Sequence, residues 1–362
     1  MDVTEDMRRP TTAAGPLVSV IVPTYNAEAY LRDCLDSLVA QTLNSIEIIC
    51  VDDASIDRSL EIMREYACRD ARIKVQALPC NSRQGAARNL GLAIATAPYI
   101  GFVDADDFVS PEYFENLYRA IVGYDADVVI TAYQDVDEGG KIFQARLRCG
   151  KMFRGLFVGR KKQETGSGIW ERKLGQGWQR NQDYSSPLLR MRCAEQFMVM
   201  NKLYRKSLVQ GLRFPEKMRF EDVPFTTEVM HRAGRVFTTP EGGYYYRQHR
   251  KATTHNFQFD FQKQMEHLTA FQMMRTYLDH ADMEWEAKHT ALEIARKSQE
   301  YIIRKLVKNN YWQTVRQIHR VEKLVSADIT LFLRARLRRR KVNFTARFVL
   351  AVILGYTAYR CL

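Results

Sequence analysis

Between residues 17 and 133, short runs of consecutive apolar residues alternate with segments whose apolar residues recur every three or four positions. The short runs are rich in β-branched residues and have the length of strands: 18–22, 46–51, 73–77, 99–103 and 128–131. Strands that are apolar on both faces are typical of a sheet covered by helices on either side. The pattern therefore predicts an α/β fold with a largely parallel, Rossmann-like central sheet and helices on both faces.

The segments between these strands have the spacing of amphipathic helices. Apolar side chains recur at intervals of three, four and seven in 31–38, 60–67, 87–94 and 114–121. Such intervals place the apolar side chains on one face of a helix. The last of these helices is expected to begin with Ser110 as its N-cap and Pro111 in its first position.

Polar residues follow three of the predicted strands at the points where these strands end. They are Pro-Thr-Tyr-Asn at 23–26, Asp-Asp-Ala-Ser at 52–55 and Asp-Ala-Asp-Asp at 104–107. Ligands of open α/β sheets bind outside the carboxyl ends of the strands. We therefore expect the functional site at this edge of the sheet.

The acidic quartet at 104–107 is a candidate metal site. Carboxylate oxygens such as those of Asp104, Asp106 and Asp107 suit Mg²⁺ or Mn²⁺, which keep other positions for water and phosphate oxygens. A divalent cation would hold a diphosphate there and stabilise a leaving nucleotide as negative charge develops. The alternative is an acidic turn in which Asp106 or Asp107 caps the next helix.

The net charge of +12 is divided unevenly along the chain. Residues 1–140 contain 11 basic and 23 acidic residues, a net charge of −12, so the remainder carries +24. An acidic segment binds phosphate poorly unless a cation assists, which supports a metal at the acidic quartet. Basic residues gather in 141–192 and 331–362, which are candidate contacts for an anionic partner.

Other features of the composition disfavour several classes of protein. A strongly basic chain could bind nucleic acid, but the sequence contains no recognised nucleic-acid module and no aromatic residues regularly interleaved with the basic runs. The seven cysteines are scattered and odd in number, which argues against a disulfide framework and favours a reducing compartment. The first 15 residues lack the apolar run of a secretory signal.

Several motifs occur in order along the chain: Val18–Asn26, Val51–Asp57, Ala87–Gly91, Gly101–Asp107, Asn201–Tyr204, Phe214–Pro215, Phe220–Asp222 and Tyr244–His249. In this series the chain closely resembles the family-2 glycosyltransferases of the GT-A fold, over residues 17–254 apart from an insertion. The resemblance implies an inverting enzyme that moves a sugar from a nucleotide diphosphate, with UDP favoured. The acceptor would be a hydroxyl of a glycan or lipid-linked glycan, as in cell-surface polysaccharide synthesis.

The resemblance assigns donor binding to seven residues: Pro23, Tyr25, Glu28, Asp53, Arg88, Asp104 and Arg247. The first three would flank the base and ribose, and Asp53 would accept a hydrogen bond from the base. The metal, Mn²⁺ or Mg²⁺, would be held by Asp106, Asp104 and His249. The sequence departs from the pattern at Arg83, where many relatives have Gly.

Asp222 would be the general base, removing the proton of the acceptor hydroxyl as its oxygen attacks the anomeric carbon. Glu221 is assigned to the catalytic centre with it, as a like charge that would raise the pKa of Asp222. The alternative is that both acids favour a helix N-terminus. Arg247 and His249 alternate along a tyrosine-rich strand, so both face one side; the alternative for them is a surface pair on an edge strand.

The sequence divides into six segments: a flexible tail (1–16), a nucleotide-sugar-binding α/β half (17–135), a basic insertion or lid (136–200), an acceptor-side segment with the base (201–256), a helical extension (257–330) and a basic amphipathic segment (331–362). The uncharged run at 348–359 is too short to span a bilayer, which needs about 20 residues. The last segment would lie on an anionic membrane surface at the cytoplasmic face, or pack on the domain as a helix.

A catalytically silent relative that serves as a scaffold or partner subunit is the remaining alternative. Loss of the acidic residues would be its simplest sign in the sequence. Asp104, Asp106 and Asp222 are all present, which favours an enzyme.

Overall fold

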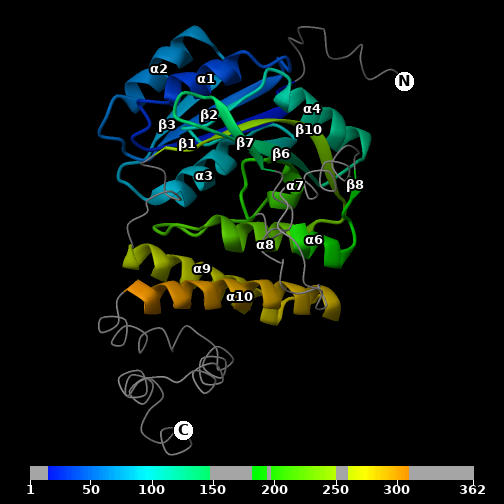
Figure 1. Ribbon diagram of the computed structural model, residues 1–362. Helices are drawn as coiled ribbons and strands as arrows, with labels where there is room; N and C mark the ends of the chain where they lie inside the picture. Colours follow the sequence, from blue (N-terminus) through cyan, green and yellow to red (C-terminus); the bar gives the residue numbers. More distant parts are fainter. Residues whose placement is uncertain (1–14, 147–181, 194–196, 250–259, 310–362) are drawn as a thin grey trace, which may run out of the picture. The chain divides into compact units, whose positions relative to one another are not determined.

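The computed structural model describes residues 15–146, 182–193, 197–249 and 260–309 (Figure 1). The chain divides into two compact units, Met1–Asn256 with Met283–Ala287, and Phe257–Asp282 with Lys288–Leu362. The predicted segment at 331–362 lies outside the described residues, as do most of the tail at 1–16 and the central part of the insertion, 147–181.

In the described part of the first unit, ten strands form one sheet in the order β3-β2-β1-β4-β9-β6-β10-β5, with β7 beside β6 and β8 beside β10. The strands are β1 (Val18–Thr24), β2 (Ile46–Asp52), β3 (Ile73–Ala77), β4 (Tyr99–Phe102), β5 (Phe108–Val109), β6 (Val128–Val136), β7 (Ile142–Arg146), β8 (Gln182–Asp183), β9 (Lys202–Arg205) and β10 (Val236–Arg247). Each of the five strands predicted from the sequence is present.

The sheet is parallel where the βαβ units were expected. Strand β1 pairs in parallel with β2 and β4, and β2 pairs in parallel with β3. Beyond β4 the sheet is mixed, because β9 lies antiparallel between β4 and β6. Strand β9 belongs to the predicted segment 201–256, so the topology brings that segment next to the strand that ends in the acidic quartet.

Strand β3 departs from the pattern expected of a covered strand. Ile73 is its one buried residue, and the side chains that follow are exposed or partly exposed. The strand lies at the edge of the sheet, where β2 is its neighbour on one side only. The prediction that this strand is covered on both faces is wrong for that reason.

The helices of the first unit are α1 (Leu31–Val39), α2 (Ser59–Arg69), α3 (Arg83–Ile94), α4 (Tyr113–Gly123), α6 (Pro187–Cys193), α7 (Lys206–Val209) and α8 (Asp222–Arg232). Helix α4 begins later than predicted. The amide of Tyr113 donates to the carbonyl of Ser110 (3.1 Å), and the amide of Ser110 donates to the carbonyl of Gly243 in β10 (2.7 Å). Because these bonds hold Ser110 and Pro111 in a turn tied to the sheet, the predicted N-cap at Ser110 and helical Pro111 are wrong.

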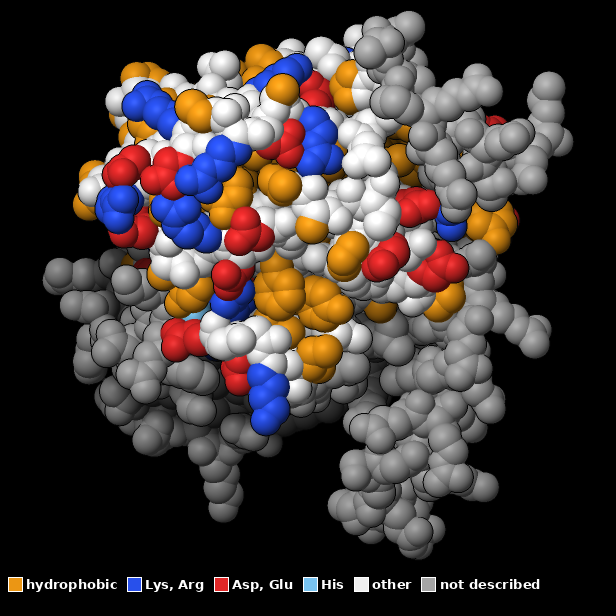
Figure 2. Space-filling model, turned by 90° about the horizontal axis from the view of Figure 1, so that it is seen from above, with side chains coloured by type: hydrophobic (Ala, Val, Ile, Leu, Met, Phe, Trp, Pro, Cys, Tyr) orange, Lys and Arg blue, Asp and Glu red, His pale blue; other side chains and the backbone are white. Residues whose placement is uncertain are grey.

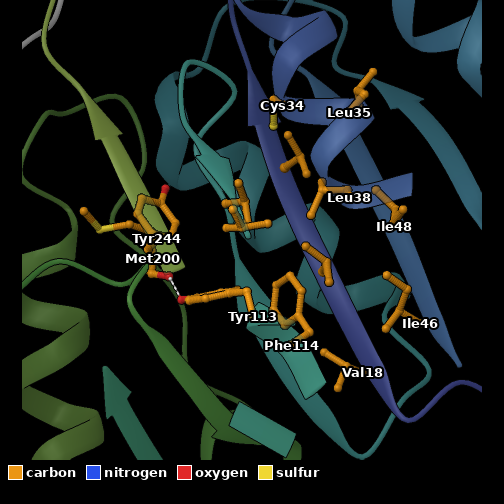
Figure 3. Close-up of a cluster of buried hydrophobic side chains, with 14 of the residues drawn as sticks. Val18, Cys34, Leu35, Leu38, Ile46, Ile48, Tyr113, Phe114, Met200 and Tyr244 are labelled. Carbon is orange, nitrogen blue, oxygen red and sulfur yellow. Dashed lines mark hydrogen bonds between the residues drawn. The ribbon is translucent and has the colours of Figure 1, made fainter. Parts of the chain in front are cut away.

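The main hydrophobic core lies between one face of the sheet and helices α1, α2 and α4. Figure 3 shows Leu35 and Leu38 of α1 in one layer with Ile48 of β2 and Phe114 of α4. Each such side chain, when fully buried, contributes about 1.5–3 kcal/mol. The hydroxyl of Tyr113 donates to the backbone carbonyl of Met200 (3.0 Å). This core fixes the carboxyl ends of β1, β2 and β4.

Helix α3 covers the opposite face of β1. Gly91 packs so closely there that a Cβ atom would lie 2.4 Å from Ile21 Cγ2. Alternate residues of a strand point to opposite faces, so Ile21 faces α3 while its neighbours Val20 and Val22 face the main core. The close contact sets α3 directly against the strand that begins the site.

The second unit contains α9 (Phe261–His280) and, from Lys288 onward, α10 (Trp285–Asn309); the two helices lie side by side (Figure 1). Asp260 caps α9 by accepting a hydrogen bond from the amide of Lys263 (2.9 Å). The helical extension predicted from residue 257 is therefore present up to Asn309, and the remainder lies outside the described residues. None of the helices that the structure describes has the length and apolar character needed to cross a membrane.

Figure 2 views the molecule from the side on which α1 and α2 lie in Figure 1, and acidic and basic side chains are interleaved on this face. Arg32 of α1 pairs with Glu65 of α2 (2.8 Å), and Arg58 pairs with Glu61 (2.9 Å). Exposed pairs of this kind contribute less than about 1 kcal/mol each. Their main effect is to balance part of the acidic charge of the first 140 residues locally.

Candidate functional site

The carboxyl ends of β1, β2 and β4 meet at one edge of the sheet, as predicted. Thr24 lies beside Asp52 in the register of β1 and β2, and the amide of Asp53 donates to the carbonyl of Thr24 (2.8 Å). Just beyond these ends, Asn26 and Ala54 have positive φ angles of 50° and 58°. A left-handed backbone is unusual for residues other than glycine and is frequent at functional sites.

The residues predicted to surround the nucleotide differ in how far their side chains are already engaged. Tyr25 is 47% exposed, just past Pro23 at the end of β1. Glu28 accepts a hydrogen bond from the amide of Arg58 (3.1 Å). Asp53 is buried and accepts a hydrogen bond from the amide of Ser82 (2.7 Å); its burial raises the pKa of Asp53 against the effect of that bond.

The acidic quartet is divided between an internal and an outward-facing part. Asp107 is completely buried and accepts hydrogen bonds from the hydroxyl of Tyr244 (2.6 Å) and the amide of Arg247 (2.8 Å). Burial and the nearby charges of Asp106 and Asp104 raise the pKa of Asp107 well above its usual range. Asp107 therefore holds the loop, whereas Asp104 and Asp106 are partly exposed. The quartet leads into β5 and not into a helix, so the helix-capping alternative is wrong.

Arg247 and His249 both reach Asp106. The Nε2 atom of His249 lies 2.8 Å from an oxygen of the Asp106 carboxylate, and Arg247 donates from Nε to the Asp106 carbonyl (3.0 Å). The ring of Tyr30 lies 4.6 Å from the His249 ring and 5.2 Å from the Arg247 guanidinium. Both side chains lie on one side, as predicted, but His249 lies beyond the end of β10 at Arg247 and not on the strand. Arg247 is buried on a strand between β6 and β5, so the alternative of a surface pair on an edge strand is wrong.

The guanidinium of Arg247 is extensively bonded within the protein. It donates to the carbonyl of Glu138 (2.6 Å) and to the carboxylate of Asp33 (2.7 Å), besides the Asp106 carbonyl. Because these partners come from three parts of the chain, Arg247 fastens the acidic loop to α1 and to the end of β6. An arginine side chain carries five N–H groups, which is more than these three bonds use. Diphosphate binding by Arg247 therefore stays a prediction.

The residues predicted to hold a metal fit a cation in part. Among the described residues, no group of three acidic, histidine or cysteine side chains gathers in a metal-binding arrangement. Asp106 and His249 do form a pair, with an O to N distance of 2.8 Å. Two adjacent ligands of an octahedral ion are about 3 Å apart when each bond is about 2.1 Å long. Asp106 and His249 could thus supply one oxygen and one nitrogen to Mn²⁺ or Mg²⁺, while the Asp104 carboxylate is bound by Arg88 (2.8 Å).

Asp222 begins α8, and its neighbour Glu221 is buried. Burial, followed by the negative charge of Glu221, raises the pKa of Asp222 to about 7, and the positive charge of Arg88 opposes this shift. Arg88 is a buried residue of α3 that donates one hydrogen bond to Asp104 and another to Glu221. The acids thus lie at a helix N-terminus, as the alternative interpretation required, and they also face the acidic quartet through Arg88.

Tyr30 and Asn89 are among the residues of this arrangement that were not assigned from the sequence. Tyr30 contacts both Arg247 and His249, but a single tyrosine before a helix gives no signal of that contact. Asn89 belongs to the Ala87–Gly91 motif, yet its partner Phe214 is 125 positions away. Only the tertiary structure shows that these pairs exist.

The chain matches known proteins in both sequence and fold. Residues 19–204 match the family model described as glycosyl transferase family 2. The chain is 35% identical over 243 residues to the uncharacterised glycosyltransferase EpsJ of Bacillus subtilis, covering 66% of this chain and 63% of that relative. It therefore spans less than two thirds of the length of this relative.

Solved structures share the fold at low sequence identity. Residues 1–349 of TarS from S. aureus, in complex with UDP-GlcNAc, superpose with a TM-score of 0.63 at 20% identity, over 95% of this chain and 91% of that chain. The mannosyltransferase PcManGT from Pyrobaculum calidifontis, in complex with GDP-Man and Mn²⁺, superposes with a TM-score of 0.52 at 15% identity, over 96% and 88%. The likeness confirms the predicted GT-A type of fold.

Proposed function

This chain belongs to glycosyl transferase family 2, and from that premise we propose that it transfers a sugar from a UDP-sugar to a hydroxyl group of a glycan or lipid-linked glycan. Transfer would invert the anomeric carbon in a single step. Support for the nucleotide comes from the fold shared with TarS, which has been solved in complex with UDP-GlcNAc. The acceptor class follows the expectation from the sequence.

The observation that carries the proposal is the environment of Asp222. A general base works best when its pKa lies near the working pH, and the pKa of Asp222 is raised to about 7. Asp222 is also linked through Glu221 and Arg88 to Asp104, at the end of the strand where the donor is expected. A carboxylate that only stabilised a helix N-terminus would need neither feature.

The proposed reaction uses Asp222 on the acceptor and the strand ends on the donor. The acceptor hydroxyl transfers its proton to the Asp222 carboxylate while its oxygen forms a bond to the anomeric carbon. The bond from that carbon to the diphosphate oxygen breaks, and the nucleotide diphosphate leaves with the electron pair. A cation bound by Asp106 and His249 would supply positive charge for the diphosphate.

The exposed ring of Tyr25 and the buried carboxylate of Asp53 support binding of the nucleotide base. Both lie at the edge where the strand ends converge, and Asp53 is fixed by the amide of Ser82. A carboxylate that is held in place loses little freedom when it accepts a further hydrogen bond. This placement supports the proposal that these two residues recognise the base.

The proposal is tested by measuring release of free UDP from a panel of UDP-sugars, with membrane lipid extract as acceptor source and Mn²⁺, Mg²⁺ or EDTA added. Asp222→Asn is expected to lower kcat at least about 100-fold, the usual contribution of a general base, while leaving UDP affinity within about threefold. Glu228→Gln, on the same helix, is the matched control because, among the described residues, Glu228 forms its ion pair with the exposed Arg232 of α8.

The variants and the pH profile together decide the outcome. Wild-type turnover is expected to rise with pH around 7, as Asp222 loses its proton, and the Glu228→Gln protein should behave in the same way. Turnover that is unaffected by Asp222→Asn would contradict the assignment of the base. If no donor is bound or turned over, the chain is better explained as a silent member of its family.

A further inference from the structure

Arg88 lies between the two proposed halves of the site. One terminal nitrogen of its guanidinium donates to Asp104 (2.8 Å), and the other donates to Glu221. The side chain is 4% exposed, and its guanidinium carbon lies 5.5 Å from the centre of the Phe214 ring. A planar guanidinium held by two carboxylates and an aromatic face has one well-defined orientation.

We infer that Arg88 is a positioning residue that fixes Asp222 through Glu221 and links this base to the donor side through Asp104. The inference rests on the proposed function, because it takes Asp222 as the base and Asp104 as a donor contact. It also reassigns Glu221, which bonds to Arg88 and positions its neighbour.

The backbone before Asp222 shows why such a residue is needed. Phe220 has a φ angle of +64°, a left-handed conformation that costs an aromatic residue about 1–2 kcal/mol. A strained conformation of this kind persists only where the surroundings hold it. The ion pair of Glu221 with Arg88 is one such contact, immediately after the strained residue. Without it, the turn that presents Asp222 would relax.

Helix α3 supplies further contacts to the segment that leads to Asp222. Asn89, next to Arg88, bonds to both the amide and the carbonyl of Phe214 (2.8 and 2.9 Å). The amide of Lys217 donates to the carbonyl of Ser82 (3.0 Å), and the amide of Ser82 donates to Asp53. One end of α3 thus connects the base-binding edge to the segment carrying Asp222.

The charges around Asp222 give Arg88 a second effect. Glu221 and Asp104 add negative charge near the base, the buried hydroxyl of Tyr204 lies in the same surroundings, and Arg88 brings the positive charge. Removing Arg88 would leave three carboxylates together and shift Asp222 toward its protonated form. A protonated Asp222 cannot accept the proton of the acceptor.

Asp104 shares Arg88 with Glu221, so binding at Asp104 and alignment of Asp222 depend on one side chain. A donor that binds to the Asp104 carboxylate weakens the interaction of Asp104 with Arg88. The positive charge of Arg88 then acts mainly on Glu221 and Asp222. Loss of Arg88 is therefore expected to affect kcat more than the affinity for UDP alone.

The test compares three variants of the full-length protein by kcat, KM and the pH dependence of kcat/KM. Glu221→Gln keeps a side-chain oxygen that can accept a hydrogen bond from Arg88 but removes the negative charge of Glu221. The midpoint of the pH profile, which reports the pKa of Asp222, should therefore fall below the wild-type value near 7. Arg88→Gln removes the positive charge, so the midpoint should rise by about 1 unit or more. Arg88→Lys keeps the charge without the fork, so kcat should fall at least about tenfold with the midpoint little changed.

Asp222→Asn and thermal unfolding are measured in parallel, with Glu228→Gln as the control that should match wild type. Midpoints that shift in opposite directions in Glu221→Gln and Arg88→Gln establish the inference, whereas unchanged midpoints in both variants overturn it. If Arg88→Gln does not fold, an unshifted midpoint in Glu221→Gln alone overturns it. Full activity of Asp222→Asn would reject Asp222 as the base. Failure of the wild type to turn over any UDP-sugar would reject the proposed function itself. Both results differ from an unshifted pH midpoint, which rejects only the role of Arg88.

Discussion

Asn89 and Phe214 exchange two hydrogen bonds, from the Phe214 amide to the Asn89 Oδ1 atom (2.8 Å) and from the Asn89 Nδ2 atom to the Phe214 carbonyl (2.9 Å). The Nδ2 atom also donates to the side chain of Glu216 (3.0 Å). One buried amide side chain thus satisfies the backbone of a residue eight positions before Asp222. The Asn89 side chain thus provides the hydrogen bonds that a neighbouring strand would otherwise provide to the backbone of Phe214.

Asn89→Ala is expected to lower the free energy of unfolding by roughly 2–3 kcal/mol, because two buried backbone groups of Phe214 lose their partners. Asn116→Ala on α4, where the side chain is partly exposed, should change it by less than about 0.5 kcal/mol. Chemical unfolding of both proteins measures the difference. Equal stability of the two variants would show that water replaces the Asn89 amide.

A second prediction concerns Arg83, the first residue of α3. Its φ angle is +72°, which explains why glycine is common at this position in the family that the motifs resemble. Arg83→Gly is expected to raise the free energy of unfolding by roughly 0.5–1 kcal/mol, since relief of strain exceeds the added entropy of the unfolded chain. Arg83→Ala keeps the Cβ atom and serves as the matched control. A gain in both variants would assign the effect to the long side chain and not to the backbone.

The comparison of sequence with structure separates two kinds of information. Strand runs and helical spacings depend on neighbours in the sequence, and for that reason the βαβ half and the acidic quartet could be predicted. The partners of Arg88 could not, because Glu221 is 133 positions away and either residue alone resembles a surface charge. The same holds for Ser110, whose helix-capping signal is overridden by its bond to Gly243 in β10.

The pH dependence of stability should report on Glu47, a buried acid on the α3 side of the sheet. Burial would raise the pKa of Glu47, but hydrogen bonds from Lys74, Ser19 and Thr96 outweigh burial and lower it to about 2. A lowered folded-state pKa stabilises the protein above the unfolded-state value of 4.5, and the contribution is lost as pH falls from there toward 2.

Glu47→Gln is accordingly expected to be less stable than wild type by roughly 2–3 kcal/mol at pH 7, with the difference shrinking as the pH falls below 4.5. Urea unfolding at several pH values measures this. Lys74→Met is the comparison, because the Lys74 side chain is 47% exposed and this substitution removes only one of the hydrogen-bond partners of Glu47. A gap between wild type and Glu47→Gln that stays constant down to pH 3 would show that the charge of Glu47 contributes nothing.

The last prediction concerns the cation that the acidic loop is expected to hold. The oxygen of Asp106 and the Nε2 atom of His249 are 2.8 Å apart, and the Nδ1 atom of His249 is buried without a hydrogen-bond partner among the described residues. Contact with Tyr30 therefore orients the ring where no hydrogen bond from Nδ1 does. Joint ligation of a cation would require Asp106 and His249 to exchange their mutual contact for bonds to the ion.

Binding of Mn²⁺ in the presence of UDP, followed by electron paramagnetic resonance of the free ion, measures this without relying on activity. Asp106→Asn and His249→Ala are expected to weaken Mn²⁺ binding at least about tenfold, because loss of even a hydrogen-bond partner of a metal ligand usually weakens binding by about 10–100-fold. Asp104→Asn should weaken it less, since the Asp104 carboxylate is bonded to Arg88, and His280→Ala on α9 is the unaffected control. If Asp104→Asn instead had the largest effect, the cation would lie beside Arg88 and the contact of Asp106 with His249 would be purely structural. Equal affinity in all four variants would rule out this edge of the sheet as the cation site.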